Sequence, residues 1–171
     1  MGIRWYGWAV TPEEAEIART EPWTVIRLAD ERHDRSGWTN ADLDKAWRYM
    51  QQLFADENEG CWARRRPAHG RGPRPAYGRA LRPAYDLVAG DVTYPNGYEA
   101  GYLPHIGILQ AERVREISHD LATISTSAIK SYFLGQGQPA EVDYVGEYMK
   151  QARDFTADAA SRGHAVVYMI R

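Results

Sequence analysis

The stretch Asn40–Phe54, NADLDKAWRYMQQLF, has the clearest periodic pattern of the chain. Its apolar residues recur every three or four positions, the spacing that places side chains on one face of a helix. These residues are Leu43, Ala46, Trp47, Met50, Leu53 and Phe54. Burial of a large apolar side chain is worth roughly 1.5–3 kcal/mol. We therefore predict one helix over the whole stretch, with this face in the core.

The polar residues at the start of the stretch also suit a helix. Thr39 or Asn40 can accept hydrogen bonds from the free N–H groups of the first turn. Asp42 and Asp44 would then lie where the helix dipole favours negative charge. Asp44 and Arg48 are four positions apart, so we expect an ion pair on the outer face that is worth a few tenths of a kcal/mol.

The length and composition of the chain are typical of one globular domain that spans residues 1–171. Its net charge is -2. The single cysteine excludes an internal disulfide and a cysteine-based metal cage. No apolar run approaches the roughly 18 residues that span a bilayer. No secretory signal is apparent, so a cytoplasmic location is the expectation.

The two ends of the chain read as strands. Ile3–Val10 alternates in polarity, and His164–Ile170 is apolar enough for the centre of a sheet. A capping box at Thr11 and Glu14 starts a helix that is expected to run to about Thr20 and to stop at Pro22.

The remaining elements are mostly helical. Trp23–Glu31 suits a short helix, followed by a loop up to Thr39. Further helices are predicted at Glu112–Ile124, Ser127–Leu134 and Ala140–Ser161, with an extended run at Leu103–Leu109. The sequence therefore predicts an α+β fold. Its small sheet contains the first and last strands, and several helices cover it.

The stretch Cys61–Tyr85 differs in composition from the rest of the chain. It holds seven arginines, several prolines and glycines, and no acidic residue, so we predict a surface loop without regular structure. The first five of these arginines are Arg64, Arg65, Arg66, Arg71 and Arg74. The loop can be solvated or held by the acidic body, or it can bind an acidic protein partner. Nucleic acid is the least favoured partner.

Several segments together resemble the YfbM-like family of bacterial proteins. They are MGIRWYGWAVTPEEAE, ADLDKAW, GYLPHIGILQAERV and AASRGHAVVYMI, and they occur in the family's order. The resemblance covers nearly the whole chain except Cys61–Tyr85. It implies a single α+β domain. Because this family has no known function, the resemblance implies no catalytic residues.

Aromatic residues give the main indication of a site. Six tryptophans and 11 tyrosines outnumber three phenylalanines, and tryptophan and tyrosine are common at binding surfaces. A groove between the Asn40–Phe54 helix and the turn-rich segment 94–105 would bring together the candidate ligand-binding residues Trp47, Tyr94, Tyr98, Tyr102 and His105.

The leading hypothesis is a non-catalytic accessory or binding module for a peptide, a protein or a small ligand. One alternative is a small enzyme that uses Asp44, Lys45, Tyr102 and His105 for acid–base chemistry in a cleft beside the same helix. The other is binding of nucleic acid or an acidic partner through the arginine-rich loop. No metal-binding or cofactor-binding motif is present, so no cofactor is expected.

Overall fold

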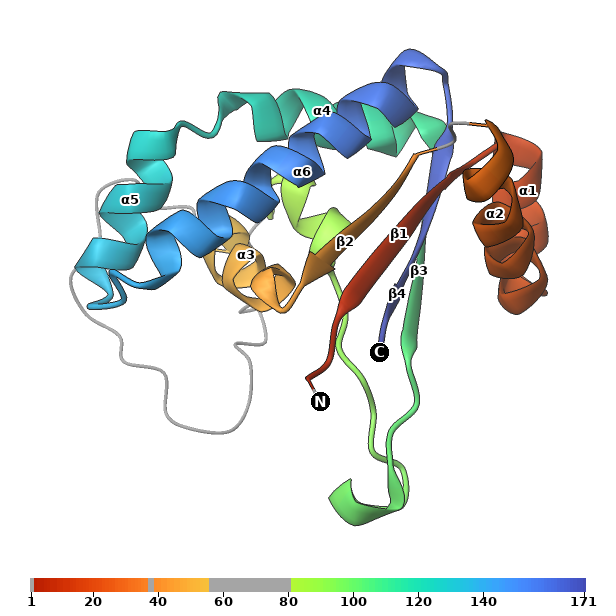
Figure 1. Cartoon of the computed structure of the whole chain (residues 1–171), viewed down its shortest axis with the longest axis horizontal. Helices are drawn as coiled ribbons and strands as arrows, with labels where there is room; N and C mark the ends of the chain where they lie inside the picture. Colours follow the sequence, from red (N-terminus) through yellow and green to blue (C-terminus); the bar gives the residue numbers. More distant parts are fainter. Residues whose placement is uncertain (1, 37–38, 56–80) are drawn as a thin grey trace.

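The computed structural model describes residues 2–36, 39–55 and 81–171. Its sheet has four antiparallel strands in the order β2-β1-β4-β3. These strands are β1 (Trp5–Val10), β2 (Asn40–Asp44), β3 (His105–Leu109) and β4 (Ala165–Ile170). The prediction that the first and last strands share one sheet is confirmed, and β1 and β4 lie side by side in its middle (Figure 1).

Helices cover both faces of the sheet (Figure 1). Two of them, α1 (Pro12–Ala18) and α2 (Pro22–Ser36), pack on the face that carries Trp8 and Val10. The opposite face carries Trp5 and packs against the larger group of helices. This group comprises α3 (Ala46–Ala55), the 3₁₀ helix η1 (Pro83–Val88), α4 (Ala111–Thr123), α5 (Thr126–Gly135) and α6 (Glu141–Ser161). The α+β prediction is confirmed.

The stretch Asn40–Phe54 is not one helix, so that prediction is wrong at its N-terminal end. Asn40–Asp44 forms β2, which pairs with the edge of β1. The chain turns at Asp44, which has a φ of 45° and whose N–H donates to the carboxylate of Asp42 at 2.7 Å. The helix α3 then begins at Ala46. A buried position such as Leu43 fits the alternation of a strand as well as the helical spacing, so the pattern did not separate the two.

The predicted apolar face is nevertheless correct. All six of its residues are buried, and Trp47 is fully enclosed. The expected ion pair between Asp44 and Arg48 does not form, because Asp44 lies in the strand. The Asp44 carboxylate lies 3.0 Å from the guanidinium of Arg4, and Arg48 pairs with Asp91 at 3.2 Å.

The second helix differs from the prediction at both of its ends. The capping box of α1 is present, with reciprocal hydrogen bonds between Thr11 and Glu14. Pro22, however, starts α2 instead of merely ending α1. α2 also continues through most of the predicted loop, and Arg32 on this extension forms an ion pair with Glu14 at 2.8 Å. The later helices agree with the prediction to within about one residue.

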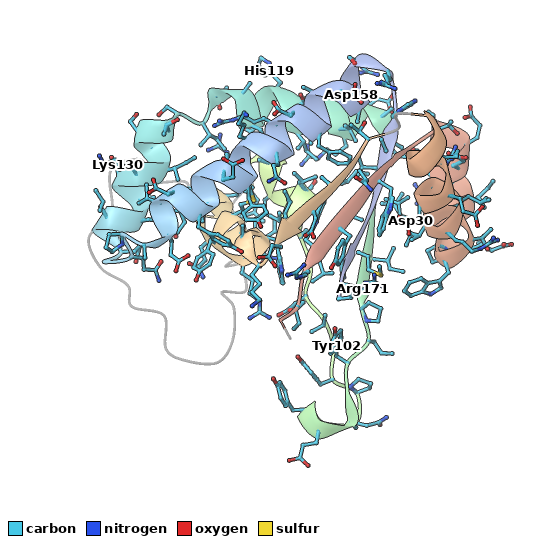
Figure 2. All side chains as sticks on the ribbon, in the orientation of Figure 1. Asp30, Tyr102, His119, Lys130, Asp158 and Arg171 are labelled. Atoms are coloured by element: carbon cyan, nitrogen blue, oxygen red, sulfur yellow. The ribbon has the colours of Figure 1, made fainter. Side chains whose placement is uncertain are left out.

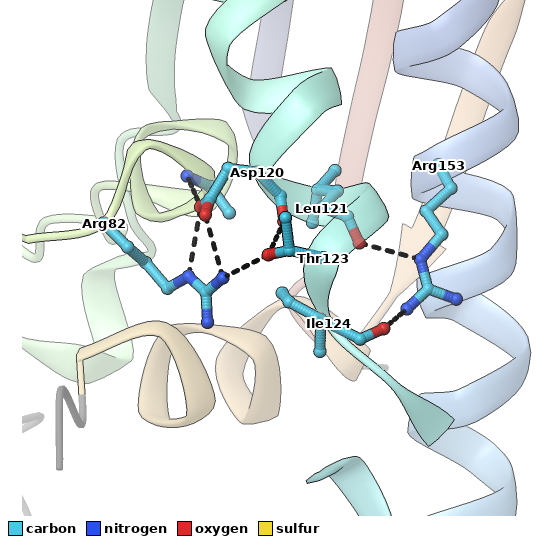
Figure 3. A network of polar contacts seen from close by, with 7 residues as sticks. Arg82, Asp120, Leu121, Thr123, Ile124 and Arg153 are labelled. Carbon is cyan, nitrogen blue, oxygen red and sulfur yellow. Dashed lines mark hydrogen bonds and ion pairs between the residues drawn. The ribbon is translucent and has the colours of Figure 1, made fainter. Parts of the chain in front are cut away.

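The end of the predicted arginine-rich loop has a defined structure. Pro83–Tyr85 belongs to η1, and the guanidinium of Arg82 binds the Asp120 carboxylate with distances of 2.8 and 3.0 Å (Figure 3). The prediction of an irregular loop up to Tyr85 is therefore wrong for its last residues, because contacts with α4 order them. The arginines at 64, 65, 66, 71 and 74 lie outside the described residues.

Side chains from distant elements hold the end of η1 and the two residues that follow it, Ala89 and Gly90. The indole of Trp5 donates to the carbonyl of Leu87 at 2.8 Å, and the hydroxyl of Tyr168 donates to the carbonyl of Ala89 at 2.7 Å. The amide of Gln51 donates to the carbonyl oxygens of residues 88 and 90. This segment therefore crosses the sheet face with its carbonyl groups satisfied by side chains.

Candidate functional site

A hollow of about 540 Å³ opens where the ends of the two central strands meet the segment that leads into β3. Figure 2 shows Arg171 at the end of β4 and Tyr102 on the neighbouring segment. We call this site the terminal hollow. Its lining residues are Gly2, Ile3, Arg4, Tyr6, Tyr102 and Arg171.

Two guanidinium groups of different character line the terminal hollow. Arg4 is paired with acidic groups, since it lies 3.0 Å from Asp44 and 3.7 Å from Asp42. A hydrogen bond with Tyr6 and the charge of Asp44 raise the pKa of Arg4. Arg171 lies over the ring of Tyr6, 5.1 Å from its centre. Within the described part of the chain, no carboxylate forms an ion pair with Arg171.

The wall of the terminal hollow is held by the core. Arg4 and Arg171 exchange both backbone hydrogen bonds, which joins the two chain ends as neighbours in the sheet. Behind this wall, the indole of Trp47 donates to the carbonyl of Ile3 at 3.3 Å. Trp47 is fully buried, so it supports the wall and does not face the hollow. The hollow is thus largely preformed, as ligand sites usually are.

Three of the predicted ligand-binding tyrosines form a cluster. The ring of Tyr94 stacks on Tyr98 at 5.0 Å and meets the edge of Tyr102 at 5.9 Å. Paired backbone hydrogen bonds between Thr93 and Leu103 hold the two arms of this segment together. Only Tyr102 reaches the terminal hollow, whereas Tyr98 is 80% exposed at the tip. Burial raises the pKa of Tyr94.

His105 lies apart from this tyrosine cluster. Its imidazole packs against Gly90, where a Cβ would come within 2.3 Å of the ring, and lies 6.0 Å from the ring of Tyr168. Gly90 also has a φ of 106°, a conformation that favours glycine. Burial lowers the pKa of His105, and the nearby charge of Asp91 opposes that effect. The contacts that the structure describes for this ring are therefore packing contacts, with Gly90 and Tyr168.

The proposed acid–base residues are not brought together. In the sheet register, Asp44 is opposite Trp5, Trp5 is opposite Ile170, and Ile170 is opposite His105. Three strand spacings therefore separate Asp44 from His105, a distance of about 14 Å. Lys45 lies against Gly2, where a Cβ would come within 2.0 Å of its side chain. Direct proton transfer between Asp44 and His105 is excluded at this distance.

Asp44 has a different partner, which the sequence analysis missed. The hydroxyl of Tyr144 on α6 donates to the Asp44 carboxylate at 2.8 Å. Burial, with this hydrogen bond and the negative charge, raises the pKa of Tyr144 to about 12. Its ring meets Tyr148 one turn later at 5.0 Å. Tyr144 and Tyr148 are four residues apart, a spacing that places both side chains on one face of a helix, and this spacing is visible in the sequence.

Some functional classes find no support among the described residues. No group of three or more histidine, cysteine or acidic side chains is placed to hold a metal ion in residues 2–36, 39–55 and 81–171. In the same ranges, every helix is too short or too polar to cross a bilayer. The five named loop arginines were predicted to form a basic site, and they lie outside the described residues.

Comparison with known proteins agrees with the fold and gives no activity. The crystal structure of YfbM from Escherichia coli, a protein of unknown function, is similar, with a TM-score of 0.51 and 13% identity over 98% of this chain and 99% of that chain. At this identity the likeness concerns the fold alone. No curated protein matches the sequence. The model of a domain of unknown function, DUF1877, matches residues 1–169, which confirms the YfbM-like resemblance: the chain belongs to the DUF1877 family.

Proposed function

We propose that this protein is a binding module that takes a small aromatic or planar ligand with a carboxylate group in the terminal hollow. The observation that carries the proposal is Arg171, a guanidinium at the hollow with no ion-pair partner among the described carboxylates. A carboxylate ligand would supply that partner, because a guanidinium binds carboxylates through paired hydrogen bonds. Tyr102 offers a ring for the apolar part of the ligand, and the Tyr6 ring supports the Arg171 guanidinium from below.

The size and the charge of the terminal hollow fit such a ligand. Its volume of about 540 Å³ lies within the usual range for small-molecule sites, roughly 300–1,000 Å³. Arg4 lies against two carboxylates, those of Asp42 and Asp44, which outnumber it, so Arg171 is the group that can select for negative charge. Because Arg171 is exposed, solvent screening reduces its contribution, and we expect simple fragments to bind with a Kd in roughly the millimolar range.

Ligand-detected NMR tests this proposal. Benzoate is the probe, and benzyl alcohol is the control that keeps the ring and lacks the charge. We expect saturation transfer from the protein to benzoate and much less to benzyl alcohol. The Arg171→Ala variant should lose the benzoate signal. The matched control is Arg115→Ala, because Arg115 is exposed on α4 and lies outside the terminal hollow.

Two results would refute the proposal. One is equal saturation transfer to benzoate and benzyl alcohol, which would mean that the charge is not recognised. The other is unchanged benzoate binding in Arg171→Ala, which would place the site elsewhere. Chemical-shift changes in a ¹H–¹⁵N spectrum would then identify the true site from the amides that move.

We also propose, as a second candidate, that the arginine-rich stretch binds an acidic partner or single-stranded nucleic acid. The supporting observation is its sequence over residues 61–81, in which six arginines are interspersed with Trp62 and Tyr77 and no acidic residue occurs. The seventh arginine of the predicted loop, Arg82, is already bound to Asp120. Filter binding with a labelled oligonucleotide tests it, since such binding weakens steeply with salt. An absence of salt-sensitive retention would exclude the nucleic-acid form of this proposal.

A further inference from the structure

The outer edge of β3 presents unused backbone groups. Arg4 and Arg171 exchange both of their backbone hydrogen bonds. In an antiparallel sheet, such hydrogen-bonded pairs alternate with pairs that do not bond. The β4 residues that bond to β3 are therefore Ile170, Tyr168 and Val166, which the register places opposite His105, Gly107 and Leu109.

It follows that Ile106 and Ile108 direct their N–H and C=O groups away from β4. No backbone hydrogen bond links these groups to any other residue that the structure describes. The strand HIGIL contains no lysine, proline or acidic residue, the features that usually protect an edge strand from pairing. Pro104 precedes it and lacks an N–H, so the open edge extends over these two residues.

The side chains at this edge are apolar and only partly covered. Ile106 and Ile108 lie on the same face of the sheet and pack against the cluster that contains Trp8 and Val167. Both remain half-buried. Another strand placed along this edge would add backbone hydrogen bonds and cover both side chains.

The edge is self-complementary, and we propose that it pairs with the same edge of a second copy of this chain. Antiparallel pairing about Gly107 places Ile106 opposite Ile108 of the partner subunit and Ile108 opposite Ile106 of the partner subunit. Each of these pairs is of the hydrogen-bonded kind, which gives four bonds between the subunits. The result is a two-fold dimer with a continuous eight-stranded sheet.

Glycine at the centre suits this arrangement. The ring of Tyr168 lies over Gly107, where a Cβ would come within 2.1 Å of it, so the two-fold axis passes through a position without a side chain.

The contact is small. A strand of five residues covers less surface than a standard stable interface, which buries roughly 1,600 Å² in total. We therefore expect a weak dimer with a Kd of roughly 100 µM, in the range of transient interfaces. With this Kd, about 85% of the chains should be monomeric at 10 µM, and about 80% should be in dimers at 1 mM.

Sedimentation velocity of the full chain from 10 µM to 1 mM tests the proposal. We expect the average mass to rise from 19.4 kDa toward twice that value. Ile106→Pro removes one N–H from each subunit, and thus two of the four bonds, without touching a bond to β4. It should weaken association at least tenfold. The matched control is Asn40→Pro, at an exposed position of the other edge strand, which should associate like the wild type.

Amide exchange in the unmodified protein gives a second measurement that needs no variant. The amides of Ile106 and Ile108 should exchange freely at 10 µM and be protected at 1 mM. A mass of 19.4 kDa throughout, with free exchange of both amides at the highest concentration, would overturn the proposal. So would a dimer that Ile106→Pro leaves unchanged, since another surface would then form it.

Discussion

Replacement of Tyr168 by phenylalanine isolates one hydrogen bond that holds the segment after η1. The Tyr168 hydroxyl donates to the carbonyl of Ala89 at 2.7 Å, and the side chain is only 3% exposed. Phenylalanine keeps the ring stacked on Trp5, at 5.7 Å between centres, so no cavity opens. The change therefore removes the bond alone. Such a bond contributes about 0.5–1.5 kcal/mol, and a buried carbonyl without a partner costs about 1–3 kcal/mol.

Ala89 is half-buried, so water can replace part of the lost bond, and we expect a loss of about 1–1.5 kcal/mol. Urea unfolding measures it. With a slope of roughly 2 kcal/mol/M for a chain of this size, the midpoint should fall by about 0.5–0.7 M at constant slope. The control is Tyr98→Phe, because Tyr98 is 80% exposed and should change stability by less than about 0.5 kcal/mol.

Two outcomes would refute this reasoning. If Tyr168→Phe were as stable as Tyr98→Phe, the bond to Ala89 would contribute nothing and the segment would be held by packing alone. A loss above about 3 kcal/mol would mean that the ring had moved, since one hydrogen bond does not account for it.

Four further predictions concern pH, an ion pair, the core and a helix cap. Burial raises the pKa of Tyr168, so above pH ~10 the Tyr168 hydroxyl ionises in the unfolded chain and stays neutral in the folded one. The stability of the wild type should therefore fall by up to about 1.4 kcal/mol per pH unit relative to Tyr168→Phe, which urea unfolding at pH 8 and pH 11 would measure. Burial alone would raise the pKa of Asp120, but Arg82 and a backbone N–H outweigh burial and lower that pKa. Asp120→Ala should therefore cost roughly 1–3 kcal/mol of stability at pH 7. In urea unfolding, the difference in stability between the wild type and this variant should shrink as the pH falls through about 4. Trp47→Ala should destabilise by roughly 3–5 kcal/mol through a core cavity, measured by thermal unfolding, and a loss under 1 kcal/mol would contradict the burial of this ring. Thr11→Ala removes the cap of α1 and should cost about 1 kcal/mol in the same assay, with no effect if solvent replaces the cap.

Part of the candidate site could be predicted from the sequence. The clustering of Tyr94, Tyr98 and Tyr102 follows from a tight turn, which brings nearby residues together whatever the rest of the fold. Arg4 and Arg171 were missed, because a shared sheet for the terminal strands did not show that these two residues are hydrogen-bonded neighbours. The missing step was the register, which depends on how both strands pack in the core.

The enzyme hypothesis depended on the same kind of information. Asp44 and His105 belong to the two edge strands of the sheet, with Trp5 and Ile170 between them. A sequence shows that both residues lie near the ends of elements. It does not show strand order, because the pairings that set the order join residues that are distant in the sequence.

The sequence by itself determined the elements whose signals are local. The capping box at Thr11, the apolar face from Ala46 to Phe54 and the long helix α6 all rest on contacts within a few residues, and each is present. Only the tertiary structure decided that Asn40–Asp44 is a strand. A strand gains its hydrogen bonds from a partner that is distant in sequence, here the edge of β1, and local periodicity carries no record of that partner.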